Sequence, residues 1–170
     1  MKTFLKNQKG FSSIEMIVYI AVFAVFVGTL MSFLLNINNT RMHAQIMLEV
    51  NDQGASLMRT LTTTIKGTTA INYPGTGASS GTISVNTTSP GTTPTIFSAN
   101  GEALFITEGA NAAVALTNNK VKITNLTFNN VSRVGTPGTI QIRFTISNTA
   151  DKLSAYEQYS ADFYGSASLR

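Results

Sequence analysis

Few residues in this chain could carry out chemistry. Its 170 residues include one histidine, His43, eight acidic residues and no cysteine. Neither a disulfide nor a thiol nucleophile can therefore form. Asp151, Glu157 and Asp162 lie near the end of the chain but do not form the dense oxygen-rich loop that calcium prefers. A Ser-His-Asp triad would need His43, but no pattern in the sequence places His43 beside a serine and an aspartate. A surface histidine is therefore the better interpretation. The sequence predicts no enzyme, no metal site and no cofactor.

One acidic residue, Glu15, occupies an unusual place. The stretch from Ile14 to Leu35 reads IEMIVYIAVFAVFVGTLMSFLL, and residues 16–40 contain no charged side chain. A helix that crosses the hydrocarbon core of a membrane needs roughly 20 apolar residues, a length that this stretch reaches. A carboxylate in such a helix is costly unless it is paired, and residues of this kind usually have a function. The sequence predicts a transmembrane helix with a functional glutamate at its start.

Three lysines, Lys2, Lys6 and Lys9, precede the apolar stretch, and no acidic residue accompanies them. The positive-inside rule then keeps the N-terminus in the cytoplasm and places the following chain outside it. These lysines supply most of the net charge of +4. The other basic residues are scattered, whereas tracking of nucleic-acid phosphates needs clustered positive charge. We expect membrane lipid as a partner and no specific binding of nucleic acid.

Two ordinary interpretations of this N-terminal region fit less well. A cleaved signal peptide has a shorter apolar stretch followed by a small-residue cleavage site. A plain signal anchor fits the length but leaves Glu15 unexplained. The segment KGFSSIE, Lys9 to Glu15, resembles the processing site of type IV prepilins and of the pseudopilins of type II secretion. Ser12 and Ser13 stand where that family usually has a Thr-Leu pair.

The resemblance implies a processing site and an assembly residue. A dedicated prepilin peptidase would cut between Gly10 and Phe11 on the cytoplasmic side and methylate the new N-terminus at Phe11. Glu15 would then meet an N-terminal amine as the fibre assembles. Because Phe11 and Glu15 are four residues apart, they lie on one helix face, so the pair could form within one subunit or between two.

The chain divides into four predicted segments. Residues 1–10 form a basic leader that is cleaved, 11–40 a transmembrane and assembly helix, 41–66 an extracytoplasmic amphipathic helix, and 67–170 a β-rich head. Spacings of three and four place apolar residues of the third segment on one stripe, with small residues in its gap. The stripe comprises Met42, Ile46, Val50, Leu57 or Met58, Leu61 and Ile65, with Gly54 and Ala55 in the gap. Gly67 is expected to end a helix that runs from about Ser12 to Lys66.

The head shows patterns of short strands. A Thr-, Ser- and Gly-rich region over 67–95 predicts loops around one strand at Thr82–Val85. Asn100-Gly101 predicts a hairpin turn, and a slip in alternation near Asn125 predicts a β-bulge. The remaining strands are expected at 95–99, 102–107, 114–116, 121–128, 140–146 and 156–169. Tyr156, Tyr159, Phe163 and Tyr164 form either a binding patch or, by preference, the packing face of the last strand.

These patterns predict an α+β, pilin-like fold in which one long N-terminal helix packs on an antiparallel sheet. The strings LTNNKVKITNLTF, TIQIRFTIS and FYGSASLR also resemble minor pilins of the J-type pseudopilin class. The resemblance implies a structural minor pilin or pseudopilin, held in the inner membrane before it enters a pilus or pseudopilus. Its partners would be other pilin-like subunits, the prepilin peptidase and the assembly machinery. Protein secretion, DNA uptake and pilus initiation all stay open as the work of the fibre, and a membrane-anchored, adhesin-like binding module is the alternative.

Overall fold

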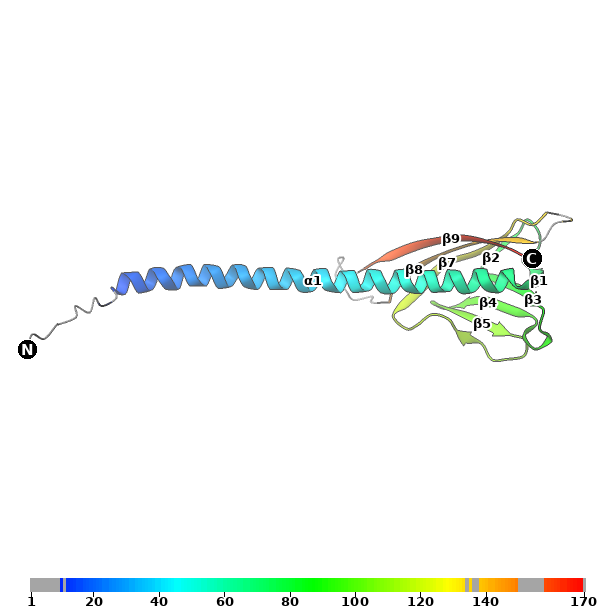
Figure 1. Ribbon diagram of the computed structural model, residues 1–170, viewed down its shortest axis with the longest axis horizontal. Helices are drawn as coiled ribbons and strands as arrows, with labels where there is room; N and C mark the ends of the chain where they lie inside the picture. Colours follow the sequence, from blue (N-terminus) through cyan, green and yellow to red (C-terminus); the bar gives the residue numbers. More distant parts are fainter. Residues whose placement is uncertain (1–9, 11, 134, 136–137, 150–157, 170) are drawn as a thin grey trace, which may run out of the picture. The chain divides into compact units, whose positions relative to one another are not determined.

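The computed structural model describes residues 10, 12–133, 135, 138–149 and 158–169. The chain separates into two compact units, Met1–Met42 and His43–Arg170. One helix, α1, runs from Ser13 to Lys66 and belongs in part to each unit (Figure 1). The predicted helix boundaries are therefore confirmed to within one residue.

The described residues of the second unit add nine strands and one short 3-10 helix to α1. In chain order they are β1 (Thr68–Tyr73), β2 (Ser79–Ser80), β3 (Thr82–Thr87), η1 (Pro90–Thr92), β4 (Thr95–Asn100), β5 (Ala103–Glu108), β6 (Val114–Ala115), β7 (Val121–Asn130), β8 (Thr139–Asn148) and β9 (Ser160–Ser168). One sheet has the order β1-β3-β4-β5-β6 and the other the order β2-β7-β8-β9. Every pairing of neighbouring strands is antiparallel. The predicted α+β arrangement of one long helix packed on antiparallel strands is thus confirmed, with two sheets in place of one.

The helix and both sheets share one hydrophobic core. Figure 1 draws β7, β8 and β9 above the second part of α1 and β4 and β5 below it. From α1 the core takes Val50, Leu57, Leu61 and Ile65, and from the strands it takes Ile83, Val85, Phe97, Leu104, Val121, Ile123, Phe128, Ile140, Ile142, Phe144, Ile146 and Ala167. Full burial of one such side chain stabilises the fold by roughly 1.5–3 kcal/mol. The predicted stripe is therefore the face of α1 that holds the two sheets together.

Two members of the predicted stripe region are not buried. Met42 is 45% exposed, and Ala55 is exposed as well. Gly54 is buried, and a Cβ built on it would overlap the ring of Phe163 on β9. Gly165, also on β9, faces Met58, and a Cβ there would come 2.5 Å from the sulfur. A glycine on each side thus lets α1 and β9 approach closely.

Helix α1 ends where the sequence predicted. The Gly67 N–H donates to the carbonyls of Thr63 (3.2 Å) and Thr64 (3.0 Å). The Thr68 hydroxyl then donates to the carbonyl of Ile65 at 2.7 Å. These bonds satisfy carbonyls that have no partner further along the helix, and β1 begins at once.

The chain passes from one sheet to the other between β6 and β7. The apolar runs on either side of Asn118-Asn119 do not pair, because β6 hydrogen-bonds to β5 whereas β7 hydrogen-bonds to β2 and β8. The Thr117 hydroxyl accepts the backbone N–H of Leu104 at 3.2 Å and so fixes the crossover to the first sheet. Polar side chains thus fix the passage of the chain from β6 to β7, which the pattern of apolar residues does not predict.

Several details of the head differ from expectation. The region 67–95 contains β1, β2 and η1 besides the predicted strand, so the expected long loop is wrong. Asn100 pairs with Ala103, which moves the hairpin loop one residue on, to Gly101 (φ 63°) and Glu102. The bulge near Asn125 is confirmed by a register shift between β7 and β8 and by its φ of 54°. Tyr156, at the predicted start of the last strand, lies outside the described residues.

Candidate functional site

Glu15 lies in the first turn of α1, where helix geometry gives it a partner. The hydroxyl of Tyr19, four residues later, donates a hydrogen bond to Glu15 Oε1 at 3.1 Å. Residues four apart lie on the same face of a helix, so the two side chains meet without distortion. The partial positive charge at a helix N-terminus also favours a carboxylate there, typically by 0.3–1 kcal/mol. The pair is exposed, and the carboxylate keeps oxygen lone pairs for a further donor.

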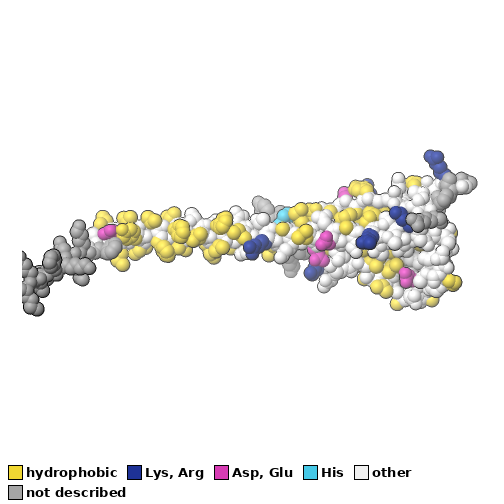
Figure 2. All heavy atoms as spheres, viewed as in Figure 1, with side chains coloured by type: hydrophobic (Ala, Val, Ile, Leu, Met, Phe, Trp, Pro, Cys, Tyr) yellow, Lys and Arg dark blue, Asp and Glu magenta, His cyan; other side chains and the backbone are white. Residues whose placement is uncertain are grey.

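The surroundings of this pair are apolar and exposed. Ile14, Phe23 and Val25 are 71%, 66% and 69% exposed, and their neighbours along the helix are similar. Figure 2 shows hydrophobic side chains covering this part of α1, with an acidic side chain near its start. Among the described residues, α1 is the one helix long and apolar enough to cross a membrane. An apolar surface of this extent marks a place for lipid or other proteins.

The predicted processing site is described in part. Gly10 is exposed, and no atom lies within 4 Å of the place where its Cβ would stand. Phe11, the predicted methylated residue, lies outside the described residues, as do Lys2, Lys6 and Lys9. The structure therefore brings Glu15 together with Tyr19, a residue that the sequence analysis missed. The spacing could have predicted this contact, because a hydroxyl four residues after a carboxylate lies on the same face of a helix.

His43, on α1, is half-buried rather than a surface histidine. Its ring stands edge-on to that of Tyr159, with 6.4 Å between ring centroids. Its Nδ1 atom is buried and has no hydrogen-bond partner within the described part of the chain. The ring thus packs as an aromatic side chain at the edge of the core.

The aromatic residues near the C-terminus do not form one patch. Tyr159 and Phe163 pack against the core, and the Phe163 ring stacks on Phe144 with 5.4 Å between centroids. Tyr164 points the other way and is 62% exposed, while Tyr156 lies outside the described residues. The preferred prediction of strand packing is confirmed for Tyr159 and Phe163 and is wrong for Tyr164.

Acidic residues do not gather into a metal site in the described ranges. No group of three or more His, Cys, Asp or Glu side chains there could hold a metal ion. Asp162 instead accepts the hydroxyl of Thr145 at 2.6 Å. Asp151 and Glu157 lie outside the described residues.

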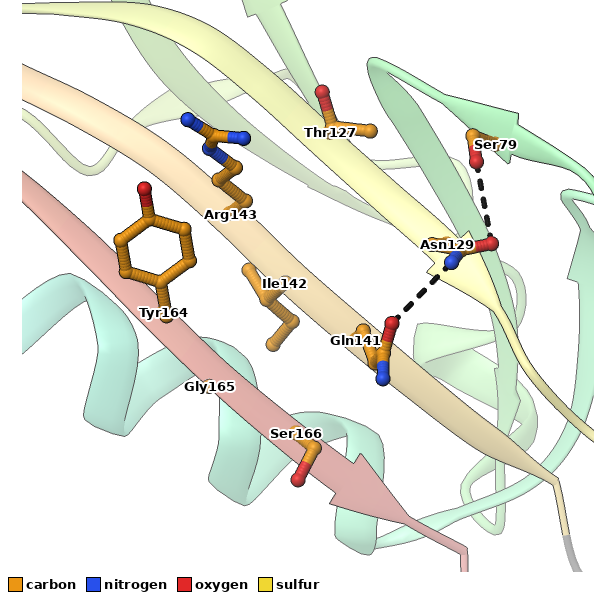
Figure 3. A pocket seen from close by; sticks show the side chains of 9 residues that line it. All are labelled: Ser79, Thr127, Asn129, Gln141, Ile142, Arg143, Tyr164, Gly165 and Ser166. Carbon is orange, nitrogen blue, oxygen red and sulfur yellow. Dashed lines mark hydrogen bonds between the residues drawn. The ribbon is translucent and has the colours of Figure 1, made fainter.

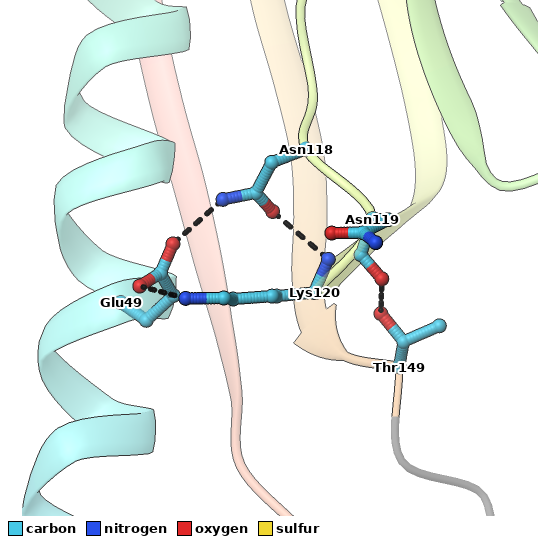
Figure 4. Close-up of polar contacts among 5 residues, drawn as sticks. All are labelled: Glu49, Asn118, Asn119, Lys120 and Thr149. Atoms are coloured by element: carbon cyan, nitrogen blue, oxygen red, sulfur yellow. Dashed lines mark hydrogen bonds and ion pairs between the residues drawn. The ribbon is translucent and has the colours of Figure 1, made fainter.

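A polar cluster ties α1 to the crossover between the sheets (Figure 4). Asn118 Nδ2 donates to Glu49 Oε1 at 2.6 Å, and Lys120 Nζ lies 3.8 Å from Glu49 Oε2. The Asn118 side-chain oxygen accepts the backbone N–H of Lys120 at 3.0 Å. Thr149 donates its hydroxyl to the carbonyl of Asn119 at 3.0 Å. With the Lys120 ammonium beside the carboxylate, these contacts have a structural role.

Among the described residues, the Glu15 carboxylate lies on an exposed apolar helix and takes no part in the packing of the core. Comparison with protein-family models, with curated proteins and with solved structures finds no match to this chain.

Proposed function

We propose that this chain is a structural subunit of the pilin type. The first part of α1 holds it in a membrane, and the same helix joins it to like subunits in a fibre. The observation that carries the proposal is the position of Glu15, the one charged residue on the exposed apolar part of α1, in the first helical turn and shortly after Gly10.

Electrostatics supports an assembly role for Glu15. The hydrogen bond from Tyr19 comes from a neutral hydroxyl, so it leaves the negative charge of Glu15 in place. A cation 4 Å away would contribute about 4 kcal/mol at an effective dielectric constant of 20. The amine that cleavage before Phe11 would create is such a cation. A neighbouring subunit that supplies it would therefore neutralise Glu15 better than Tyr19 does.

The finer assignment rests on the resemblance of the N-terminal segment and of three strings in the head to the pilin family. The basic leader places the N-terminus in the cytoplasm and the head outside it. Gly10 and Phe11 form the processing site for a prepilin peptidase, and Phe11 carries the methyl group. The subunit is a minor pilin or pseudopilin of the J type, and its partners are other pilin-like subunits and the assembly machinery. The alternative is an adhesin-like module on a permanent membrane anchor.

Fractionation of cells separates these two functions. An epitope-tagged chain is followed in membranes and in sheared surface fibres, with and without an active assembly ATPase. A fibre subunit is expected in the sheared fraction only when the ATPase is active, and in membranes in both cases. A chain that stays in the membrane in both strains contradicts the proposal and supports the anchored module.

A further inference from the structure

The outer face of the sheet β2-β7-β8-β9 carries a shallow depression of about 580 Å³ (Figure 3). Its lining comes from all four strands and consists of two adjacent cross-strand rows of outward-facing side chains, with Ile142 and Gly165 between them. The inward-facing side chains of β8 fill the core, so these outward-facing rows are not needed to build the fold.

Amide and hydroxyl groups form the first row. Register places Ser79 opposite Asn129, Asn129 opposite Gln141, and Gln141 opposite Ser166. The Ser79 hydroxyl donates to Asn129 Oδ1 at 3.2 Å, and Asn129 Nδ2 donates to Gln141 Oε1 at 3.3 Å. This chain of bonds orients both amides and leaves each NH₂ group a hydrogen for a ligand. The row is therefore prepared to bind hydroxyl groups.

A cation lies at the centre of the second row. Thr127 faces Arg143, and Arg143 faces Tyr164. The guanidinium carbon of Arg143 lies 5.0 Å from the centroid of the Tyr164 ring, a cation–π contact that orients the guanidinium plane. No carboxylate of the described residues lies within ion-pair distance of Arg143. The carboxylate of Asp162 accepts the hydroxyls of Thr145 and Tyr164 instead.

We propose that this face binds a glycan that carries carboxylate groups, of the hexuronate type. Arg143 would bind the carboxylate through two parallel N–H bonds, which suit the planar guanidinium fork. Asn129 and Gln141 would bind the sugar hydroxyls. Tyr164, which is 62% exposed, would offer apolar ring surface to the sugar carbons.

Charge and surface chemistry favour this ligand class. A nucleic acid would need several cations to replace its counterions, whereas Arg143 is the one Lys or Arg among the described residues that line the depression. An extended peptide binds through an open strand edge and through pockets for its side chains. Here the rows present side chains rather than an open strand edge. Among the described lining residues Tyr164 offers an exposed ring, whereas Ile142 is only 2% exposed. A glycan presents many hydroxyls and one acid per residue, which matches the lining.

The test is a titration of the full-length protein in nanodiscs of neutral phosphatidylcholine. The probe is a hexuronate oligosaccharide, and the matched ligand is the same oligosaccharide with its carboxyl groups reduced to alcohols. The wild type is expected to bind the acidic form at least about tenfold more tightly than the reduced form, since charged hydrogen bonds are lost. Arg143→Gln should weaken binding of the acidic form by a similar factor. Gln141→Ala should weaken binding of both forms.

Arg59→Gln is the matched control, because it removes the same charge from an exposed position on α1. It should bind like the wild type. Absence of binding, equal affinity for both forms, wild-type affinity in Arg143→Gln, or equal competition by an oligoglutamate peptide would each overturn the proposal. Circular dichroism checks that each variant is folded. If Arg143→Gln is not, the reduced ligand and Gln141→Ala still decide the question.

Discussion

At the scale of single residues, Glu15 combines a local partner with a net charge that the partner cannot remove. The hydroxyl of Tyr19 is a neutral donor, so the pair stays anionic on an otherwise apolar surface. A charged group in such a place resists the bilayer unless a cation joins it. The Glu15 carboxylate and the Tyr19 hydroxyl are therefore expected to contribute differently to fibre assembly, and separate substitutions can measure each contribution.

Glu15→Gln keeps the shape of the side chain and removes its charge. We expect normal membrane insertion and cleavage. The ratio of fibre to membrane protein should fall at least about tenfold, because loss of an ion pair between Glu15 and a neighbouring amine that contributes about 1.4 kcal/mol to assembly changes the equilibrium by that factor. The ratio is measured by quantitative immunoblotting of sheared and membrane fractions. Tyr19→Phe, which removes only the hydroxyl, should change the ratio less than threefold, a difference of under about 0.7 kcal/mol. Wild-type incorporation of Glu15→Gln would show that Glu15 is not an assembly determinant.

Gly54 is the second residue whose identity has a physical reason. A Cβ at this position overlaps the Phe163 ring, so we expect Gly54→Ala to lower the free energy of unfolding by about 1–3 kcal/mol through overpacking. Helix propensity alone would instead raise it by up to about 1 kcal/mol. Thermal unfolding of the β signal in circular dichroism, on full-length protein in detergent, distinguishes these outcomes.

Two further variants show whether Phe163 is the cause. Adding Phe163→Leu to Gly54→Ala should recover part of the loss, because the smaller side chain makes room for the methyl group. Gly28→Ala is the control, since a Cβ on Gly28 meets no atom within 4 Å. It should leave the unfolding of the head unchanged. Equal melting temperatures for the wild type and Gly54→Ala would remove Gly54 from the packing argument.

At the scale of secondary-structure elements, β7 changes register at its bulge. Asn125 has φ 54°, a left-handed conformation that costs most residues roughly 1–2 kcal/mol. Asn125→Val should therefore destabilise the protein by about this amount, whereas Asn125→Gly should be close to neutral. Thr124→Val, at the exposed position just before the bulge, is the control and should have little effect. Urea unfolding gives the three values, and a harmless Asn125→Val would mean that the bulge does not constrain β7.

The contact between α1 and the crossover depends on one short hydrogen bond more than on an ion pair. The bond from Asn118 to Glu49 measures 2.6 Å between half-buried groups, whereas Lys120 lies 3.8 Å away and its side chain is 70% exposed. We expect Asn118→Ala to cost about 1–3 kcal/mol and Lys120→Ala about 0–1 kcal/mol. Urea unfolding at low and high salt tests the ranking, and only the Lys120 effect should fade with salt. A larger cost for Lys120→Ala would reverse this interpretation.

Periodicity explains which elements the sequence could predict. The strict alternation of Ile140, Ile142, Phe144 and Ile146 identifies β8, and spacings of three and four identify the buried stripe of α1. β1 and β2 were missed because the Thr-, Ser- and Gly-rich composition around them predicts loops. The division into two sheets was missed because it depends on tertiary contacts of Thr117 and Asn118. At the candidate site, family resemblance indicated Glu15, but Tyr19 needed the helix geometry.

At the scale of the whole molecule, the two units place their apolar residues in opposite ways. Residues of the first unit expose apolar side chains along α1, whereas the second unit encloses one core between α1 and two sheets. A soluble protein rarely exposes so much apolar surface, so the first unit requires a lipid or protein environment. A protein that serves both as membrane anchor and as fibre subunit needs its basic leader for the first role only. Under the proposed function, removal of the leader separates the two roles.

We predict that the mature protein begins at Phe11 with a methylated N-terminus. Under the proposed function, cleavage after Gly10 removes the three leader lysines and creates the amine that pairs with Glu15. Gly10 has open space around it, which lets a peptidase approach its backbone, and a bulky side chain would fill that space. Intact-mass measurement of the membrane-extracted protein should find residues 1–10 absent and one methyl group added. Gly10→Val should retain the leader and abolish fibre incorporation, while Ser12→Ala, as the control, should be processed normally. Full-length wild-type protein in membranes that contain an active peptidase would contradict the processing prediction and leave α1 as a permanent anchor.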